Sequence, residues 1–164
     1  MDRDEPGYAQ LIGLLDSDYI SYRLISHRPE GRTDAASALR GHPLDQAAKS
    51  VMVRVASGKR SRRYVLAVVP GDRRVDLRAL ADRYSAREAA FASRHVAERL
   101  AGSVSGSFAP FAFSPDLDLL VDDRLLAHRE IYFNACRLDL SIALPVAHYL
   151  ALARPQIAPI ATAT

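Results

Sequence analysis

Residues 50–69 read SVMVRVASGKRSRRYVLAVV, two valine-rich segments joined by a basic link. The segments 50–56 and 64–69 are rich in β-branched residues, which favour strands. The link over 57–63 is short enough to connect the two strands as an antiparallel hairpin. The turn signal Pro70-Gly71-Asp72 follows directly. The stretch therefore predicts a β-hairpin that ends in a turn.

Further strands and helices are predicted on both sides of this hairpin from apolar spacing and cap signals. Strands are expected at 22–26, 89–92, 117–121, 131–133 and 140–144. Helices are expected at 8–15, 33–39, 76–84, 93–100 and 145–153, with another short one from Pro43. Thr33 and Ser93 are the expected N-caps, and Gly41 and Gly102 lie just past the expected ends of their helices.

The order of these elements decides the fold class. About seven short strands and five helices follow one another without the regular alternation of a doubly wound sheet. The glycine-rich phosphate loops of mononucleotide folds do not occur. We therefore expect an α+β fold around a mixed, curved or barrel-like sheet. Residues 1–153 are expected to form one domain, and residues 154–164 a tail that leaves the domain or lies against its surface.

Composition narrows the class of protein. The chain has 164 residues, 49% hydrophobic and 25% charged, as expected for a single globular domain rather than a disordered chain. The one cysteine, Cys136, excludes an intramolecular disulfide framework and a cysteine-based zinc site. No apolar run approaches the roughly 20 residues of a membrane span, and the start of the chain is too charged for a secretory signal. We expect a cytoplasmic protein without a membrane partner.

Lysine is rare in this chain, which draws attention to each lysine. Of the 22 residues that are Lys or Arg, the lysines are Lys49 and Lys59. Lys49 lies between a short predicted helix and an apolar strand, so its ammonium is expected to stay close to the sheet. It could serve as a fixed cation for a phosphate or a carbonyl oxygen. The alternative, favoured by spacing alone, is a lysine that snorkels from the strand edge.

A second candidate is the loop that reads GSVSGSFAPF over 102–111. Glycines let the backbone approach a ligand closely, and such a loop can aim several N–H groups at one point. Those donors could bind a carbonyl oxygen or a developing oxyanion. The alternative, again favoured by spacing alone, is a plain turn between a helix and a strand.

Other polar residues point less clearly to chemistry. Asp122-Asp123 could bind a metal or act as acid and base, but aspartates at a strand end more often cap or terminate it. Asn134 could orient a substrate or form a turn, and Cys136 is expected to be a small buried residue. His27, at the end of a predicted strand, is a candidate for a pocket rim. The five histidines show no metal-ligand spacing, so no metal site is expected.

Basic residues gather around the predicted hairpin link. The cluster is formed by Arg54, Lys59, Arg60, Arg62, Arg63, Arg73 and Arg74. It could contact a phosphate backbone, which agrees with the net charge of +3. The alternative is a solvated hairpin tip. No aromatic residues interleave the cluster, so stacking on single-stranded bases is not indicated.

Taken together, these motifs resemble a known family. Their order is His27 at a strand end, Thr33 at a helix start, QAAKS at 46–50, YVLAVVPGD at 64–72, a Gly-x-x-x-Pro loop from Gly106 to Pro110, Val121-Asp122 and Phe133-Asn134-Ala135. The ordered set resembles the YbaK/ProX family, the aminoacyl-tRNA editing domain associated with prolyl-tRNA synthetase. It is most similar to the free-standing YeaK-like branch, over residues 8–153.

The resemblance implies a compact domain with a mixed, barrel-like sheet of about seven strands surrounded by helices. It implies hydrolysis of the ester between a mischarged amino acid and the terminal adenosine of tRNA, with no cofactor. The implied catalytic residues are Lys49, Gly106 and Ser107. The implied substrate-binding residues are His27, Thr33, Ser50, Phe108, Pro110, Asp122 and Asn134, and the implied tRNA-binding residues are Lys59, Arg60, Arg62 and Arg63.

Ser50 bears on which amino acid is removed. Family members that remove alanine commonly carry Asn after the lysine, whereas Ser50 follows Lys49 here. Ser50 therefore does not favour alanine, and relatives on other branches remove Cys, Ser or Thr. The resemblance implies a small amino acid, Ser, Thr, Ala or Cys, on a mischarged tRNA. An aminoacyl-tRNA synthetase is a further candidate partner. Two other hypotheses are a non-catalytic module that binds an aminoacyl group or nucleotide, and an interaction protein that accompanies a synthetase.

Overall fold

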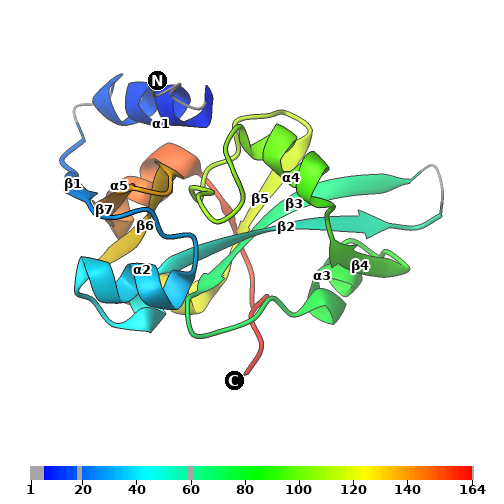
Figure 1. The fold of residues 1–164 in the computed structure, drawn as a ribbon. Helices are drawn as coiled ribbons and strands as arrows, with labels where there is room; N and C mark the ends of the chain where they lie inside the picture. Colours follow the sequence, from blue (N-terminus) through cyan, green and yellow to red (C-terminus); the bar gives the residue numbers. More distant parts are fainter. Residues whose placement is uncertain (1–5, 18–19, 59–60, 164) are drawn as a thin grey trace.

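The computed structural model describes residues 6–17, 20–58 and 61–163, which form helices packed on two β-sheets (Figure 1). The helices are α1 (Pro6–Ser17), α2 (Thr33–Arg40), α3 (Leu77–Arg83), α4 (Arg94–Ala101) and α5 (Val146–Ala153), with short 3₁₀ helices at Leu44–Gln46 and Asp123–Ala127. The strands are β1 (Arg23–Ser26), β2 (Ala48–Ala56), β3 (Arg62–Pro70), β4 (Glu88–Phe91), β5 (Leu117–Val121), β6 (Glu130–Arg137), β7 (Leu140–Pro145) and β8 (Gln156–Ile157).

The strands form two open sheets rather than one barrel. The smaller sheet has the order β1-β7-β6 and is antiparallel, and the larger has the order β4-β2-β3-β5-β8. The larger sheet is mixed, because β3–β5 and β5–β8 pair in parallel while β2 pairs antiparallel with β3 and β4. A bridge between Ala47 and Tyr132 links the two sheets. The α+β class and mixed pairing are confirmed, but the barrel-like closure is wrong.

The long hairpin β2–β3 separates two hydrophobic clusters because successive side chains of a strand point to opposite faces. Met52, Leu66 and Val68 face the larger cluster, which includes residues from α1, β6, β7 and α5. On the other face, Val53 and Val65 pack in a second cluster with residues of α3 and the C-terminal segment. The hairpin predicted from residues 50–69 is confirmed, and the structure places it between the two clusters.

Helix boundaries follow local signals at several ends. Ser93 caps α4 by accepting a hydrogen bond from the Val96 amide, and Gly41 and Gly102 end α2 and α4 in the left-handed conformation, as predicted. Thr33 is not the N-cap of α2, because Arg32 occupies that position without a side-chain cap and Thr33 is the first helical residue. Thr33 lines the pocket described below.

The segment predicted as a tail from residue 154 is part of the packed structure. β8 extends the larger sheet beside β5, and Ala161 bridges to Val75. Ala158, Ile160 and Ala161 are buried in the second cluster. The segment contains two prolines and a strand of two residues, so its apolar residues show neither a helical nor a strand periodicity. The sequence pattern therefore suggested a tail.

Asp122 anchors this segment. Its carboxylate is fully buried and accepts hydrogen bonds from the amides of Ile160 at 2.9 Å and Ala161 at 2.8 Å, and from the Arg124 amide at 2.9 Å. Without the carboxylate, two buried amides of the C-terminal segment would lose their acceptor. A buried unpaired amide destabilises the folded state.

Asp122→Ala is expected to lower the free energy of unfolding by about 2–4 kcal/mol, because at least two buried donors are left unsatisfied. Urea denaturation followed by circular dichroism measures the change. Asp123→Ala, at an exposed neighbouring position, is the matched control and should be nearly neutral. Equal stability of the two variants would contradict an anchoring role for Asp122.

Candidate functional site

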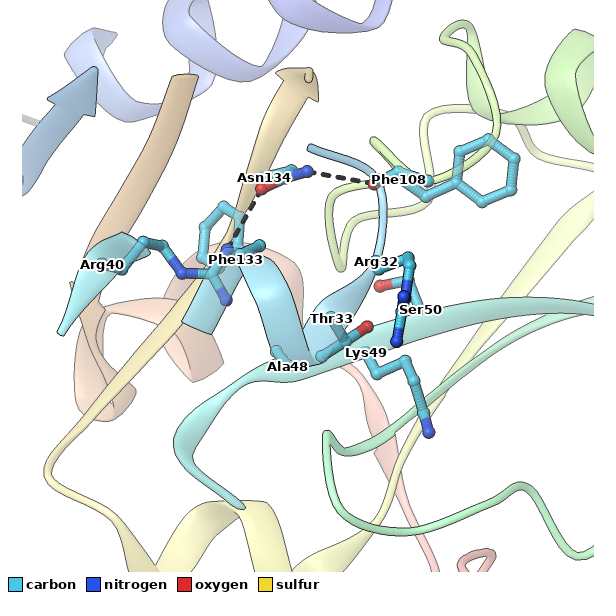
Figure 2. Close-up of a pocket in the computed structure, with 12 residues that line it drawn as sticks. Arg32, Thr33, Arg40, Ala48, Lys49, Ser50, Phe108, Phe133 and Asn134 are labelled. Atoms are coloured by element: carbon cyan, nitrogen blue, oxygen red, sulfur yellow. Dashed lines mark hydrogen bonds between the residues drawn. The ribbon is translucent and has the colours of Figure 1, made fainter. Parts of the chain in front are cut away.

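A pocket of about 210 Å³ lies where α2, the start of β2, β6 and the loop before Pro110 meet (Figure 2). Its lining residues are Gly31, Arg32, Thr33, Ala36, Arg40, Ala48, Lys49, Ser50, Gly106, Phe108, Phe133 and Asn134. The lining thus joins six of the residues predicted for the site, namely Thr33, Lys49, Ser50, Gly106, Phe108 and Asn134. They come from four separate segments of the chain.

The pocket exists because one stretch of the β2 edge has no neighbouring strand. β6 reaches β2 at Ala47, and the ladder with β4 begins near Met52, whose carbonyl accepts a hydrogen bond from the Ala92 amide at 3.0 Å. The Ala47 carbonyl points the other way, to the Gly71 amide at 3.0 Å. Because backbone groups alternate along a strand, the N–H and C=O of Ser50 point to the same side as those of Met52. The main chain of Ser50 therefore faces the gap between β6 and β4.

The side chain of Ser50 also lines the pocket. Its Oγ is shielded from solvent and forms no hydrogen bond with any described residue. Buried polar groups of folded proteins normally have a partner, so an unpaired hydroxyl at a pocket wall indicates that a ligand or water completes it. Ser50 thus brings one hydroxyl and one peptide edge to the same place.

Asn134 holds the walls of the pocket together. Its Nδ2 donates to the carbonyls of Glu30 at 2.9 Å and Gly106 at 3.0 Å (Figure 2 shows the second contact, made toward the loop that carries Phe108). Its Oδ1 accepts from Arg40 Nη1 at 3.1 Å and from Ser141 Oγ at 2.9 Å. One buried amide therefore fixes the segment before α2, α2 itself and the glycine loop relative to β6.

Arg40 brings a positive charge to the pocket, and its partners are neutral. Besides Asn134, its guanidinium donates to Ser141 Oγ at 3.2 Å and to His42 Nε2 at 2.9 Å. Burial lowers the pKa of Arg40 to about 10, so the side chain stays charged at neutral pH. No described carboxylate forms an ion pair with it. Its charge is therefore balanced only by neutral hydrogen-bond partners and can interact with a polar ligand.

The contact with Arg40 sets the protonation state of His42. Arginine can only donate, so His42 Nε2 accepts and its proton sits on Nδ1, 2.8 Å from the Pro43 carbonyl oxygen. The ring stacks on Tyr132 with 3.9 Å between centroids. Burial is the main cause that lowers the pKa of His42, and the charge of Arg40 adds to it, although the hydrogen bond to Pro43 and the charges of Asp45 and Glu130 act in the opposite direction.

Lys49 lies at the rim of the pocket. Its ammonium donates to the carbonyl oxygen of Arg73 and, at 3.5 Å, to that of Gly71, on the loop that follows β3. Figure 2 shows the ammonium turned away from Asn134. Burial is the main cause that lowers the pKa of Lys49, followed by the nearby charge of Arg74. The ammonium is thus held near the sheet, as predicted, by two carbonyls.

The glycine loop meets the segment before α2 backbone to backbone. Gly106 has φ of +89°, and a Cβ at this position would lie 2.8 Å from Gly31 Cα. The Ser107 amide and hydroxyl both donate to the Val104 carbonyl, and Ser107 is fully buried outside the pocket lining. The Ser107 amide is therefore already paired, while no hydrogen bond among the described residues uses the amides of Gly106 or Phe108.

Three of the predicted substrate-binding residues lie outside the pocket lining. His27 Nε2 contacts Ser141 Oγ at 2.6 Å, so His27 stands behind Asn134 rather than at the rim. The Pro110 carbonyl accepts a hydrogen bond from the hydroxyl of Tyr149 at 2.6 Å in the core. Asp122 anchors the C-terminal segment as described above. The structural interpretation of Asp122 is confirmed by these contacts.

The basic hairpin link is only partly described. Lys59 and Arg60 lie outside the described residues. Arg62 is exposed, whereas Arg63 Nε donates to Asp118 Oδ2 at 3.0 Å, so its charge is paired. Of the residues predicted for tRNA contact, the structure thus leaves Arg62 facing solvent without an ion pair to a described residue.

Sequence reasoning missed several lining residues. Arg40 was overlooked because it lies in the last helical turn, where a cation is ordinary. Gly31 and Arg32 precede the helix in a stretch without a pattern, and Phe133 was read as part of a strand. The signal available for Gly31 was its position directly before a helix start, since glycine permits close approach of two backbones.

Residues 6–17, 20–58 and 61–163 lack two features that would bear on function. They contain no group of three or more His, Cys, Asp or Glu residues arranged to hold a metal ion. Within the same ranges, no helix has the length and apolar character needed to cross a bilayer.

Gly106→Ala is expected to lower the free energy of unfolding by about 2–4 kcal/mol and to displace the pocket wall, because it adds both left-handed strain and a clash with Gly31. Gly41→Ala is the matched control, since Gly41 has φ of +76° and open space around it. It should cost about 1 kcal/mol, from strain alone. Equal losses in thermal or urea denaturation would contradict the backbone contact.

Protonation of His42 is expected to weaken the fold on acidification. Because the folded state favours neutral His42, its contribution is fully present above the unfolded pKa of about 6.5 and is lost as the pH falls below it. The free energy of unfolding should therefore fall more between pH 7.5 and 5 for the wild type than for His42→Phe, which keeps the ring on Tyr132 but cannot titrate. Parallel urea-denaturation curves over this range would rule out the effect.

Comparisons with known proteins agree with this geometry. A family model described as "Aminoacyl-tRNA editing domain" matches residues 27–152. The chain is 36% identical over 151 residues, 92% of this chain and 90% of the relative, to the "Multifunctional Ser/Thr-tRNA deacylase ProXp-y" of Escherichia coli strain K12. The same protein of Escherichia coli O157:H7 matches equally.

Solved structures share the fold at low sequence identity. A hypothetical protein aligns with a TM-score of 0.83 and 19% identity, covering 93% of this chain and 99% of the other. A putative trans-editing enzyme for prolyl tRNA synthetase aligns with a TM-score of 0.78 and 19% identity, covering 96% and 98%. The resemblance found in the sequence is confirmed: this chain belongs to the aminoacyl-tRNA editing domain family.

Proposed function

We propose that this protein is a free-standing aminoacyl-tRNA deacylase that hydrolyses the ester of serine or threonine on a mischarged tRNA. The observation that carries the proposal is Ser50, which brings an unpaired hydroxyl and an uncovered peptide edge to a small pocket. The Escherichia coli relative is named as a Ser/Thr-tRNA deacylase. The pocket, at about 210 Å³, is smaller than typical pockets for drug-sized ligands of roughly 300–1,000 Å³, which suits one small amino acid.

Ser50 can read the aminoacyl group at two points. Its carbonyl oxygen, on the uncovered edge of β2, can accept a hydrogen bond from the α-ammonium of the amino acid. Its hydroxyl can pair with the hydroxyl of a serine or threonine side chain. A site that hydrogen-bonds a substrate hydroxyl discriminates against analogues that lack it, because the buried polar group then stays unpaired.

Hydrolysis of such an ester needs positioning and charge stabilisation more than a strong nucleophile. Among the loop residues that line the pocket, Gly106 and Phe108 have amides without a partner in the described chain and can donate to the developing oxyanion, whereas the Ser107 amide is bound to Val104. Lys49 at the rim supplies a cation for the oxyanion or for the terminal phosphate. Thr33 and Asn134 complete the walls that orient the aminoacyl group.

The tRNA is proposed to run from the pocket along β2 toward the basic hairpin. From Ser50 to Ser57 the strand covers roughly 23 Å, at about 3.3 Å per residue. Arg62 beyond this point faces solvent and can contact backbone phosphates, and Lys59 and Arg60 belong to the same link in the sequence. Phosphate contacts of this kind position a nucleic acid without reading its sequence.

The test is deacylation of a panel of tRNAs charged with Ser, Thr, Ala, Cys and Pro. The wild type should release serine or threonine fastest. Lys49→Ala should lower the rate on the order of 10²–10³-fold, the loss typical for removal of a group that stabilises an oxyanion. Arg78→Ala, which removes an exposed cation from α3 outside the pocket lining, is the charge control and should keep the wild-type rate.

Ser50→Ala separates specificity from catalysis in the same assay. It should lower the rate for seryl-tRNA by roughly 10-fold relative to alanyl-tRNA, since one buried hydrogen bond is lost. Binding of seryl-tRNA without release of serine would favour a non-catalytic module and contradict the proposal. An unchanged ratio of Ser to Ala rates would remove Ser50 from recognition of the side chain.

A further inference from the structure

An open groove of about 560 Å³ continues outward from the pocket. It shares Gly31, Ser50, Gly106 and Phe108 with the pocket, so the two form one connected surface. The rest of its lining is Val51 and Met52 of β2, Phe91 at the end of β4, Ala92, Ser105, and Arg94 and Ala97 of α4. A molecule that fills the pocket and extends beyond it can therefore continue into this groove.

Phe91 is unusual on this surface. It is 63% exposed and is the only aromatic residue among the exposed large hydrophobic residues of the described chain, the others being Leu24, Val104 and Ile157. Met52 and Ala97 are buried in the larger cluster, so their positions are fixed by the core. Phe91 pairs with Val53, so its side chain lies on the face of the sheet that carries the second cluster, whereas Met52 and Ala97 line the groove from the other face. An exposed aromatic ring beside the uncovered edge of β2 is suited to a flat aromatic ligand.

The groove also has a cation. Arg94 is mostly exposed at the start of α4, and its contact with Glu98 is long, at 3.5 Å from Nε to Oε2. An exposed arginine with a weak partner can turn to an anionic group of a ligand. The groove thus offers an aromatic face and a positive charge next to a pocket sized for an amino acid.

We propose that this groove binds the terminal adenosine of the aminoacyl-tRNA, with the adenine base stacked on Phe91 and the adjoining phosphate near Arg94. The inference rests on the proposed function, because an aminoacyl group in the pocket is esterified to the ribose of that nucleotide. The ribose then lies at the shared residues and the base enters the groove. Stacking on an aromatic side chain holds a base without reading its identity.

The experiment compares the deacylation kinetics of Phe91→Ala, Phe91→Tyr and the wild type with seryl-tRNA and threonyl-tRNA. Phe91→Ala should raise KM on the order of 10- to 100-fold, as expected for loss of one base–aromatic stack, and leave kcat within about twofold. Phe91→Tyr should restore KM. Leu24→Ala is the matched control, because Leu24 is exposed on β1 and outside the groove, and its KM should match the wild type.

A spectroscopic readout is independent of turnover. The chain contains no tryptophan, so Phe91→Trp introduces a single tryptophan, whose emission is separable from that of the tyrosines. Its emission should be quenched with saturation by adenosine and by a non-hydrolysable 3′-serylamino-3′-deoxyadenosine, whereas Leu24→Trp should not respond.

The outcomes distinguish the two proposals. A wild type that is inactive on the whole tRNA panel overturns the deacylase function. An active wild type whose KM is unchanged in Phe91→Ala overturns the adenosine groove alone. If Phe91→Ala changes the sedimentation coefficient relative to the wild type but leaves KM unchanged, Phe91 contacts a second copy of the chain. That result also overturns the adenosine groove.

Discussion

The side-chain amide of Asn134 is the interaction on which the site depends. It binds two carbonyls and accepts from Arg40 and Ser141, so it uses its full hydrogen-bonding capacity while buried. Three segments that are far apart in the chain, namely the segment before α2, α2 and the glycine loop, are each tied to β6 through it. A fully satisfied buried network of this kind specifies one arrangement, because each alternative would leave a polar group without a partner. The pocket is in this sense a product of hydrogen bonding more than of apolar packing.

The interrupted edge of β2 supplies the second requirement. An uncovered edge in the middle of a strand is costly unless a ligand or water uses its backbone groups. Here β6 and β4 stop on either side of Ser50, and the buried hydroxyl of the same residue is unpaired. The sheet therefore presents an incomplete ladder at the position where the glycine loop and α2 close around it.

Much of the fold could be read from the sequence because its signals are local. The valine-rich hairpin, the Ser93 cap and the glycine helix ends depend on residues within a few positions of one another. The pairing of β8 with β5 could not be read, because two residues carry no period and their position depends on the distant Asp122. Closure into a barrel was wrong for the same reason, since the link between the sheets is a single long-range bridge. In the site, Lys49 and Asn134 were candidates from the sequence pattern, and Ser50 was found through the resemblance. Arg40 was not found, because its role arises from hydrogen bonds to Asn134 and Ser141, which lie 94 and 101 residues away in the sequence.

The backbone contact between Gly106 and Gly31 also limits how this pocket can change during evolution. On that wall neither residue has a side chain to enlarge or trim, and a methyl group at Gly106 would meet the opposite main chain. Ala36 and Ala48, both buried in the lining, offer the contrary case, because larger side chains there would shorten the cavity without moving the backbone. Substitutions at Ala36 of α2 and Ala48 of β2 can therefore change the size of the accepted amino acid, while the backbone contact between the two glycines stays the same.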